Sequence, residues 1–217
     1  MFTLSGNLFT AFYAQILEHP AKQTSFDNFL NYKIPKEINF LASFKMIETK
    51  RLRLIRWDEA HFQAIFDNNL VQLGELLDCN TPHQWTTFAD MTDALPFFYE
   101  GFKKNGNYWG SFFSVHKADR QLLGTCGFKG VLDEDGSVEI GYEIIESYRQ
   151  QGLASEAAQG LIDFVFSHDA VQLVRAHTLA NENPSVSVLK KLGFQFIGLF
   201  NDPDDGDIWR FELTRRK

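Results

Sequence analysis

Hydrophobic and polar positions follow two different periods around the middle of the chain. Between residues 138 and 145, apolar side chains at every second position alternate with Glu139, Gly141 and Glu143, which predicts a half-buried strand. From residue 153 to 165, apolar residues instead recur every three or four positions, which predicts a helix of about three turns. The short polar segment between them, residues 149–154, becomes the centre of the predicted site.

The pattern elsewhere predicts a mixed succession of strands and helices. Asp58 is the expected N-cap of the first helix, and Gly193 fits the end of the last one. Pro96 predicts either a kink in an intermediate helix or its division into two shorter helices. Residues 133–136 form an expected hairpin turn. The predicted elements begin with a strand around Leu52 and Leu54, with its alternating arginines, and a helix over 58–70 that 73–77 either continue or follow as a second piece. They continue with a helix over 86–106, strands over 108–116, 121–130 and 138–145, a helix from 153, a strand over 173–179, a short helix before Gly193, and a hairpin of 195–200 and 208–213.

Residues 1–45 differ from the rest and predict a partly helical N-terminal extension. Their apolar residues have loose helical spacing, and Pro20 and Pro35 interrupt the two aromatic-rich runs. We expect the extension to pack its aromatic side chains on the main domain, residues 46–217, or on a second subunit, which would make a homodimer.

Composition narrows the class of protein. Of 217 residues, 44% are hydrophobic and 22 are phenylalanine, which is ample for one aromatic-rich core. The net charge of −7 argues against nucleic-acid binding, which requires a basic face. Cys79 and Cys126 form no disulfide framework, and neither a secretory leader nor a run of ~20 apolar residues is present. These features predict a cytoplasmic protein without membrane association.

The segment Arg149–Ala154 is a candidate phosphate-binding loop. A strand-to-helix loop leaves backbone N–H groups unpaired at the positive end of the helix, where a pyrophosphate binds readily. Gly152 permits close backbone approach and Ala154 keeps the first turn open. The loop matches neither the nucleotide P-loop nor the G-x-G-x-x-G motif. On these residues alone, an ordinary strand-to-helix turn and a nucleotide-phosphate site remain alternatives.

The order of these parts resembles the GNAT acetyltransferase superfamily over residues 47–214. The strand Glu139–Tyr142 and the helix end Val188–Phe194 are similar to the branch that contains the ribosomal-protein N-terminal acetyltransferases. The resemblance implies an α/β fold with a mixed, mostly antiparallel sheet, splayed between its fourth and fifth strands and flanked by helices. It also implies an acyltransferase that moves acetyl from acetyl-CoA to a primary amine, either a protein N-terminus or a small amine.

The resemblance implies a cofactor site as well. Backbone amides of Arg149, Gln150, Gln151, Gly152, Leu153 and Ala154 would hold the pyrophosphate of acetyl-CoA. Ile144 and Ile145 would bond the pantetheine amides, and Asn181 or Asn183, with Ser185, would flank the cofactor's arm. The family usually shows N-x-x-S here, and this sequence departs from that spacing. No metal is implied, and the histidines show no metal-ligand spacing.

Acetyl transfer to an amine requires a base, because alkyl amines are mostly protonated at neutral pH. Glu139, where the family often carries a base, is the first choice and Glu143, on the same face, is the reserve; a solvated strand carboxylate is the alternative for both. Some family members carry an acidic tyrosine where this chain has Leu189, which leaves Ser185 and Tyr142 as candidate acids. His177 is interpreted as packed or exposed, and Cys126 as buried and inert. A fold member that binds acyl-CoA without turnover is the alternative function.

Overall fold

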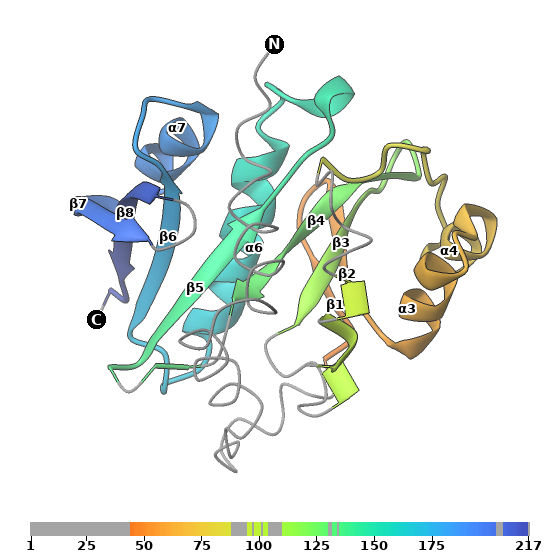
Figure 1. Cartoon of the computed structure of the whole chain (residues 1–217), viewed down its shortest axis with the longest axis horizontal. Coiled ribbons are helices and arrows are strands. Elements are labelled where there is room, and N and C mark those ends of the chain that lie inside the picture. The colour runs from red at the N-terminus through yellow and green to blue at the C-terminus, as the bar shows by residue number, and fades with distance from the viewer. Residues whose placement is uncertain are drawn as a thin grey trace.

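The protein is an eight-stranded mixed sheet with helices on both faces (Figure 1). The computed structural model describes residues 44–87, 95–96, 98–100, 102–103, 110–129, 132–133, 135–202 and 206–216. The strands are β1 (Met46–Glu48), β2 (Leu52–Arg56), β3 (Ser111–His116), β4 (Gln121–Lys129), β5 (Ser137–Tyr142), β6 (Leu173–Leu179), β7 (Gln195–Asp202) and β8 (Gly206–Thr214). The helices are α3 (Glu59–Phe66), α4 (Leu70–Leu77), the 3-10 turn η3 (Glu146–Tyr148), α6 (Leu153–Phe166) and α7 (Pro184–Lys191).

The two faces of the sheet bury separate hydrophobic clusters. Successive side chains of a strand point to opposite faces, so the neighbours Phe112 and Phe113 of β3 enter different clusters. The larger cluster joins the sheet to α6 and α7, with Leu161 and Leu189 fully buried. The smaller one joins it to α3 and α4 through an aromatic group that includes Trp57, stacked on Phe113 with ring centroids 4.6 Å apart.

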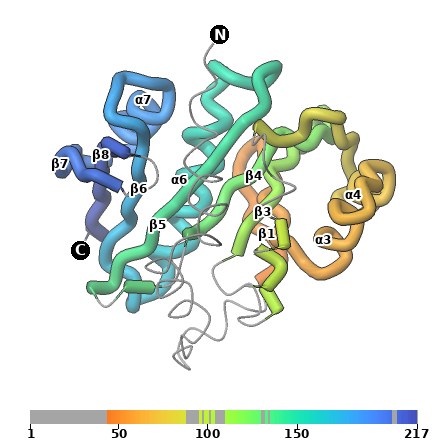
Figure 2. Tube along the Cα trace, in the orientation of Figure 1, coloured from red at the N-terminus to blue at the C-terminus, as the bar shows by residue number. Residues whose placement is uncertain are grey.

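The sheet opens between β5 and β6. All neighbouring strands are antiparallel except this pair, which is parallel and bonded only from Ser137 to Glu139 on β5. Beyond Glu139, β5 stays with β4, and β6 stays with β8 along its whole length. The upper ends of β5 and β6 therefore diverge (Figure 1). From the end of β5 the chain turns through η3 and returns as α6 (Figure 2).

This architecture confirms the expected mixed, mostly antiparallel sheet that splays between the fourth and fifth predicted strands. The cap of the first helix is confirmed too: the Asp58 carboxylate accepts from the His61 N–H at 3.2 Å, and His61 Nδ1 accepts from the Asp58 N–H in return. In the described part of the chain, no helix is long and apolar enough to cross a membrane.

Several predicted boundaries were wrong. The strand expected around Leu52 and Leu54 is β2, but the strand β1 before it was not predicted; Thr49 turns the chain between them by accepting from the Leu52 N–H at 3.0 Å. The helix expected to reach residue 70 ends at Phe66, and Asn69 caps the separate helix α4. The strand expected to end at residue 145 ends at Tyr142. The extension over 1–45 lies outside the described residues except for 44–45, as does most of the helix expected over 86–106.

Candidate active site

The loop that joins β5 to α6 presents an uncapped helix end. Gly152 is the N-cap of α6, has a φ of 75°, and leaves the helix without a side-chain cap. Gln150 also has a positive φ, of 60°. A helix that starts in this way keeps its first N–H groups available for an anion, and the left-handed φ at position 152 favours glycine.

Two cations stand beside this helix end. A Cβ added to Gly152 would lie 3.7 Å from Nη2 of Arg51 and 3.9 Å from Nζ of Lys191. Arg51 also donates from Nη1 to the carbonyl oxygen of Gln151 at 2.9 Å, and its Nε forms an ion pair with Glu156 at 2.7 Å. The positive charge near the loop adds to the helix dipole, so the electrostatics of this end suit a phosphate group.

Ile144 and Ile145 differ in whether their backbone N–H groups already bond within the protein. The Ile145 N–H donates to the Leu123 carbonyl at 2.7 Å, and its own carbonyl accepts from Tyr148 at 3.0 Å. The expectation that the Ile145 backbone is free was therefore wrong, because the segment stays paired with β4. Ile144 lies between two residues bonded to β4, so its N–H points to the opposite edge, toward the opening. Its carbonyl accepts from Arg149 Nε at 3.0 Å.

At the first turn of α7, Asn183 is occupied as a structural cap. Its side-chain oxygen accepts from the N–H groups of Ser185 and Val186 at 3.0 and 3.2 Å, and its amide donates to Thr178 at 2.7 Å. Asn181 is exposed. Tyr142 reaches across the opening, where its hydroxyl donates to the Ser185 carbonyl at 3.5 Å. Burial raises the pKa of Tyr142, which makes it a weaker acid than an ordinary tyrosine.

Glu139 lies at the last pair before the sheet opens, between a lysine and a histidine. Its Oε1 is 2.8 Å from Nζ of Lys129 on β4, and its Oε2 is 3.0 Å from Nδ1 of His177 on β6. Burial alone would raise the pKa of Glu139, but Lys129 and His177 outweigh burial and lower it to about 2. The carboxylate is therefore ionised at neutral pH and binds protons weakly.

Glu143 is enclosed by hydroxyl and amide donors. Its Oε1 accepts from the hydroxyls of Thr86 at 2.8 Å and Thr125 at 2.9 Å, and its Oε2 accepts from the N–H and the hydroxyl of Thr87. These donors fill about four acceptor positions of a carboxylate, so no position faces a substrate. Burial raises the pKa of Glu143 despite these bonds. The geometry argues against Glu143 as the base and makes it an anchor for residues 86–87.

The sequence-based reasoning missed most partners in this region. The contacts of His177, Thr86 and Thr87 could be identified only from the structure. A signal for Lys129 was present, because a hairpin turn over residues 133–136 places residue 129 nearly opposite residue 139. No comparable signal existed for His177, since its distance from Glu139 depends on a parallel pair formed across a whole helix.

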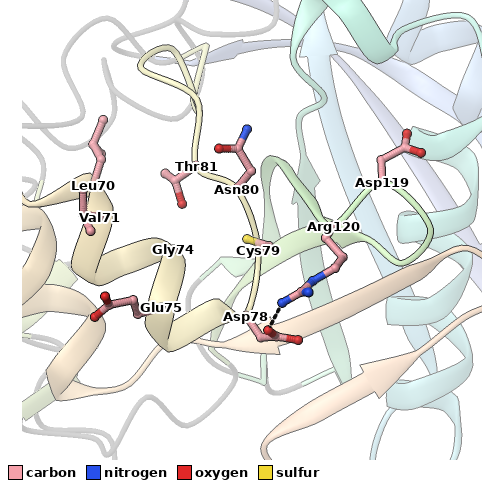
Figure 3. A pocket seen from close by; sticks show the side chains of 10 residues that line it. All are labelled: Leu70, Val71, Gly74, Glu75, Asp78, Cys79, Asn80, Thr81, Asp119 and Arg120. Carbon is pink, nitrogen blue, oxygen red and sulfur yellow. Dashed lines mark hydrogen bonds and ion pairs between the residues drawn. The ribbon is translucent and has the colours of Figure 1, made fainter.

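A separate hollow of about 810 Å³ lies between α4 and the turn from β3 to β4 (Figure 3). Its lining includes an ion pair between Asp78 and Arg120, and the thiol of Cys79. Burial raises the pKa of Cys79 to about 11 and that of Cys126 to about 12, so neither is a ready nucleophile. Both cysteines are free, and the interpretation of Cys126 as buried is confirmed. Within the described ranges no cluster of metal-ligating side chains is found.

Comparison with known proteins agrees with this geometry. Residues 51–195 match the model of the acetyltransferase (GNAT) domain. The uncharacterized N-acetyltransferase YjdG of Bacillus subtilis is 34% identical over 151 residues, which cover 69% of this chain and 89% of that protein. The uncharacterized N-acetyltransferase p20 of Bacillus licheniformis is 33% identical over 111 residues, covering 49% of this chain and 62% of that protein.

Solved structures share the fold at low sequence identity. RimL, a ribosomal-protein α-N-acetyltransferase solved in complex with coenzyme A, superposes with a TM-score of 0.57 at 16% identity, covering 78% of this chain and 98% of RimL. An acetyltransferase from Salmonella typhimurium, described as modifying the N-terminal serine of a 50S ribosomal protein, gives a TM-score of 0.59 at 15% identity, covering 78% of this chain and 99% of that one.

The domain match and the relatives, together with the opened sheet and the uncapped helix, identify an acyltransferase. More particularly, the chain belongs to the GNAT family of N-acetyltransferases.

Proposed function

We propose that the protein transfers an acetyl group from acetyl-CoA to a primary amine by direct attack of the amine on the thioester. The observation that carries this proposal is the opening between β5 and β6, which leads to the uncapped end of α6 beside Arg51 and Lys191. A strand-like cofactor arm fits an open sheet edge, and a pyrophosphate fits a helix N-terminus that is flanked by cations.

The residues present suit the cofactor. Backbone amides over residues 149–154 would hold the pyrophosphate, and the N–H of Ile144, which points toward the opening, would bond the pantetheine arm. Asn181 and Ser185, with the cap residue Asn183, would flank the arm from α7. Acetyl-CoA supplies the electrophilic acyl thioester; the chain supplies position, which by itself removes much of the barrier between two bound reactants.

Two side chains are proposed to act on the reactants. The ionised Glu139 lies at the point where the sheet opens, and we assign it to the path that removes the proton from the acceptor amine. Ser185, half-buried on the first turn of α7, is the candidate that gives a proton to the departing thiolate. Tyr142 is less suited to that role, because its pKa is raised.

The acceptor we favour is a protein N-terminus. The described neighbours RimL and the Salmonella enzyme act on the N-termini of ribosomal proteins, and both superpose over most of this chain. These two structures share the fold with this chain, and a small amine is the second candidate acceptor. A homodimer and a cytoplasmic location also remain predictions from the sequence.

Calorimetry with acetyl-CoA tests the proposal, followed by an assay with a short peptide that begins with serine and with a panel of small amines. Micromolar binding with turnover is expected. Binding without turnover of any amine would favour the alternative, an acyl-CoA-binding module. The absence of binding would overturn the proposal.

A further inference from the structure

A row of polar side chains crosses four strands at the level where the sheet opens. Lys129 on β4 and Glu139 on β5 are direct cross-strand partners, and so are His177 on β6 and Arg210 on β8. Glu139 joins the two pairs by its contact with His177, its diagonal neighbour across the parallel pair. His177 lies beyond the last bonded residues of that pair, on the part of β6 that borders the opening.

The partners of His177 fix its protonation pattern. Arg210 donates from Nε to His177 Nε2 at 3.0 Å, and a guanidinium is only a donor, so Nε2 carries a lone pair. The carboxylate of Glu139 is only an acceptor when ionised, so the proton of the neutral ring sits on Nδ1, which is 3.0 Å from Oε2. A carboxylate that holds Nδ1–H in this way orients the ring and stabilises the imidazolium that forms when Nε2 takes a proton.

In this arrangement Glu139 orients the ring of His177, and the imidazole is the group suited to remove a proton. Both oxygens of Glu139 are engaged, and its carboxylate holds protons too weakly to draw one from an ammonium at neutral pH. An imidazole is the side chain whose ordinary pKa suits the uptake of a proton near neutral pH. Arg175 is the direct strand partner of Glu139 on β6, but it bonds to Glu212 at 2.9 Å and also pairs with Asp133 and Asp135. The guanidinium of Arg175 is therefore paired with other carboxylates, and Glu139 pairs with His177 instead.

We propose that His177, oriented by Glu139, is the base that takes the proton from the acceptor ammonium, and that Arg210 occupies Nε2 until the acceptor displaces it. This inference rests on the proposed function. Arg210 occupies the position that the acceptor would take, because each presents an N–H donor to the lone pair on Nε2 of His177. Its guanidinium carbon lies 3.9 Å from the centre of the Phe200 ring, which gives it a resting place on β7 that does not depend on His177.

The proposed step balances as follows. Nε2 takes one proton from the bound ammonium, and the freed nitrogen lone pair forms the N–C bond with the thioester carbonyl. The C–S bond then breaks with its electron pair going to sulfur, as the new amide nitrogen loses a second proton. The thiolate takes up one of the two protons and the other passes to solvent, so His177 returns to its neutral form.

The test compares the full-length wild-type chain with His177→Asn and His177→Ala, using a short peptide with an N-terminal serine as the acceptor. The asparagine amide can still donate to Glu139 from the Nδ1 position but provides no base. If His177 is the base, both variants lose about 10²-fold in kcat/KM at pH 7. The deficit shrinks at pH 9, above the pKa of about 7.7 to 8.0 of a peptide α-amine, because the acceptor then arrives neutral.

If His177 only positions other groups, His177→Asn should have a kcat/KM close to that of the wild type. The loss of kcat/KM in His177→Ala should then be the same at pH 7 and pH 9. That result, or wild-type turnover in both variants, would overturn the assignment of His177 and leave the proposed function intact. Wild-type protein that binds acetyl-CoA but turns over neither the peptide nor small amines would overturn both. Nitrogen NMR of the labelled protein adds an independent measurement: Nδ1 protonated and Nε2 unprotonated at pH 7 is expected, and the reverse tautomer would overturn the inference.

Discussion

The amide N–H of Ile145 donates to the carbonyl oxygen of Leu123 at 2.7 Å, although β5 has already ended at Tyr142. The segment after β5 therefore stays attached to β4, and only every second residue offers its backbone to the opening. Ile144 is that residue, and it directly precedes Ile145 on the way to the phosphate loop. The contact fixes which backbone groups can meet a cofactor arm.

Gly152→Asp should abolish binding of acetyl-CoA. The new carboxylate would stand near Arg51 and Lys191, where it would compete with the pyrophosphate for their charge. Gly152→Ala is the control, since it carries the same left-handed strain, about 1 kcal/mol, without a charge. Calorimetry on both variants separates the two effects. Equal affinity in the Asp and Ala variants would contradict an anion site at this helix end.

Glu139→Gln should reduce the loss of folding stability that the wild type shows as the pH falls from 5 to 2. The folded-state pKa of Glu139 is lowered to about 2, below its unfolded value of about 4.3. The ionised carboxylate therefore stabilises the fold above pH ~4, and this contribution, on the order of 2 to 3 kcal/mol, is lost as the pH falls toward ~2.

Urea denaturation of the wild type and this variant between pH 5 and pH 2 measures the effect. Glu182→Gln is the matched control, because Glu182 pairs with Lys190 on the surface with 68% of its side chain exposed. The wild type and the Glu182 variant should lose stability in parallel. An unchanged acid limb in Glu139→Gln would show that the contacts with Lys129 and His177 do not hold in solution.

Glu143→Gln should destabilise the fold by about 2 kcal/mol at pH 7, because one carboxylate oxygen becomes an amide that faces donors. The Thr87 N–H, 2.7 Å from Oε2, would lose its acceptor if the amide takes that place. The urea midpoint checks the loss, with the exposed Glu146→Gln as a control that should stay near wild type. Full stability in Glu143→Gln would remove the case for an anchor of residues 86–87.

Asn183→Ala should lower the free energy of unfolding by about 1 kcal/mol or more, through loss of the α7 cap. For a chain of this size that corresponds to a drop in Tm of about 2 to 4 °C per kcal/mol. Asn183→Asp keeps the capping oxygen but loses the donor to Thr178. Its Tm should therefore lie between the Tm of the wild type and that of Asn183→Ala. Asn181→Ala should leave Tm unchanged, and an equal drop there would count against the cap.

Much of the fold was predictable because its signals are local. The alternation from residue 138 and the helical repeat from residue 153 both depend on neighbours within a few positions, and β5 and α6 appear where they were expected. The Asp58 cap is local in the same sense. The end of β5 was missed, because apolar residues continue through Ile145 and the segment after Tyr142 still bonds to the β4 backbone.

The candidate site was less predictable, because its bonds join distant segments. Glu139 was chosen from the resemblance, yet its low pKa comes from Lys129 and His177. The hairpin turn relates Lys129 to Glu139, but no spacing in the sequence relates His177 to it. Glu143 shows the same limit, since Thr86 and Thr87 lie on a segment far from it in the chain. A pattern marks which side chains share a face, but only the register decides which of them touch.

The contacts of Arg51 have a thermodynamic consequence for ligand capture. Arg51 bonds the Gln151 carbonyl and Glu156, and Thr49 donates to the same carboxylate at 2.7 Å. The turn between β1 and β2 thus holds the loop through its own hydrogen bonds. A loop already restrained loses little conformational entropy when an anion settles on it, so more of the contact energy appears as affinity. The turn between β1 and β2, about 100 residues from the loop in sequence, would thereby influence how tightly the enzyme holds its acyl donor.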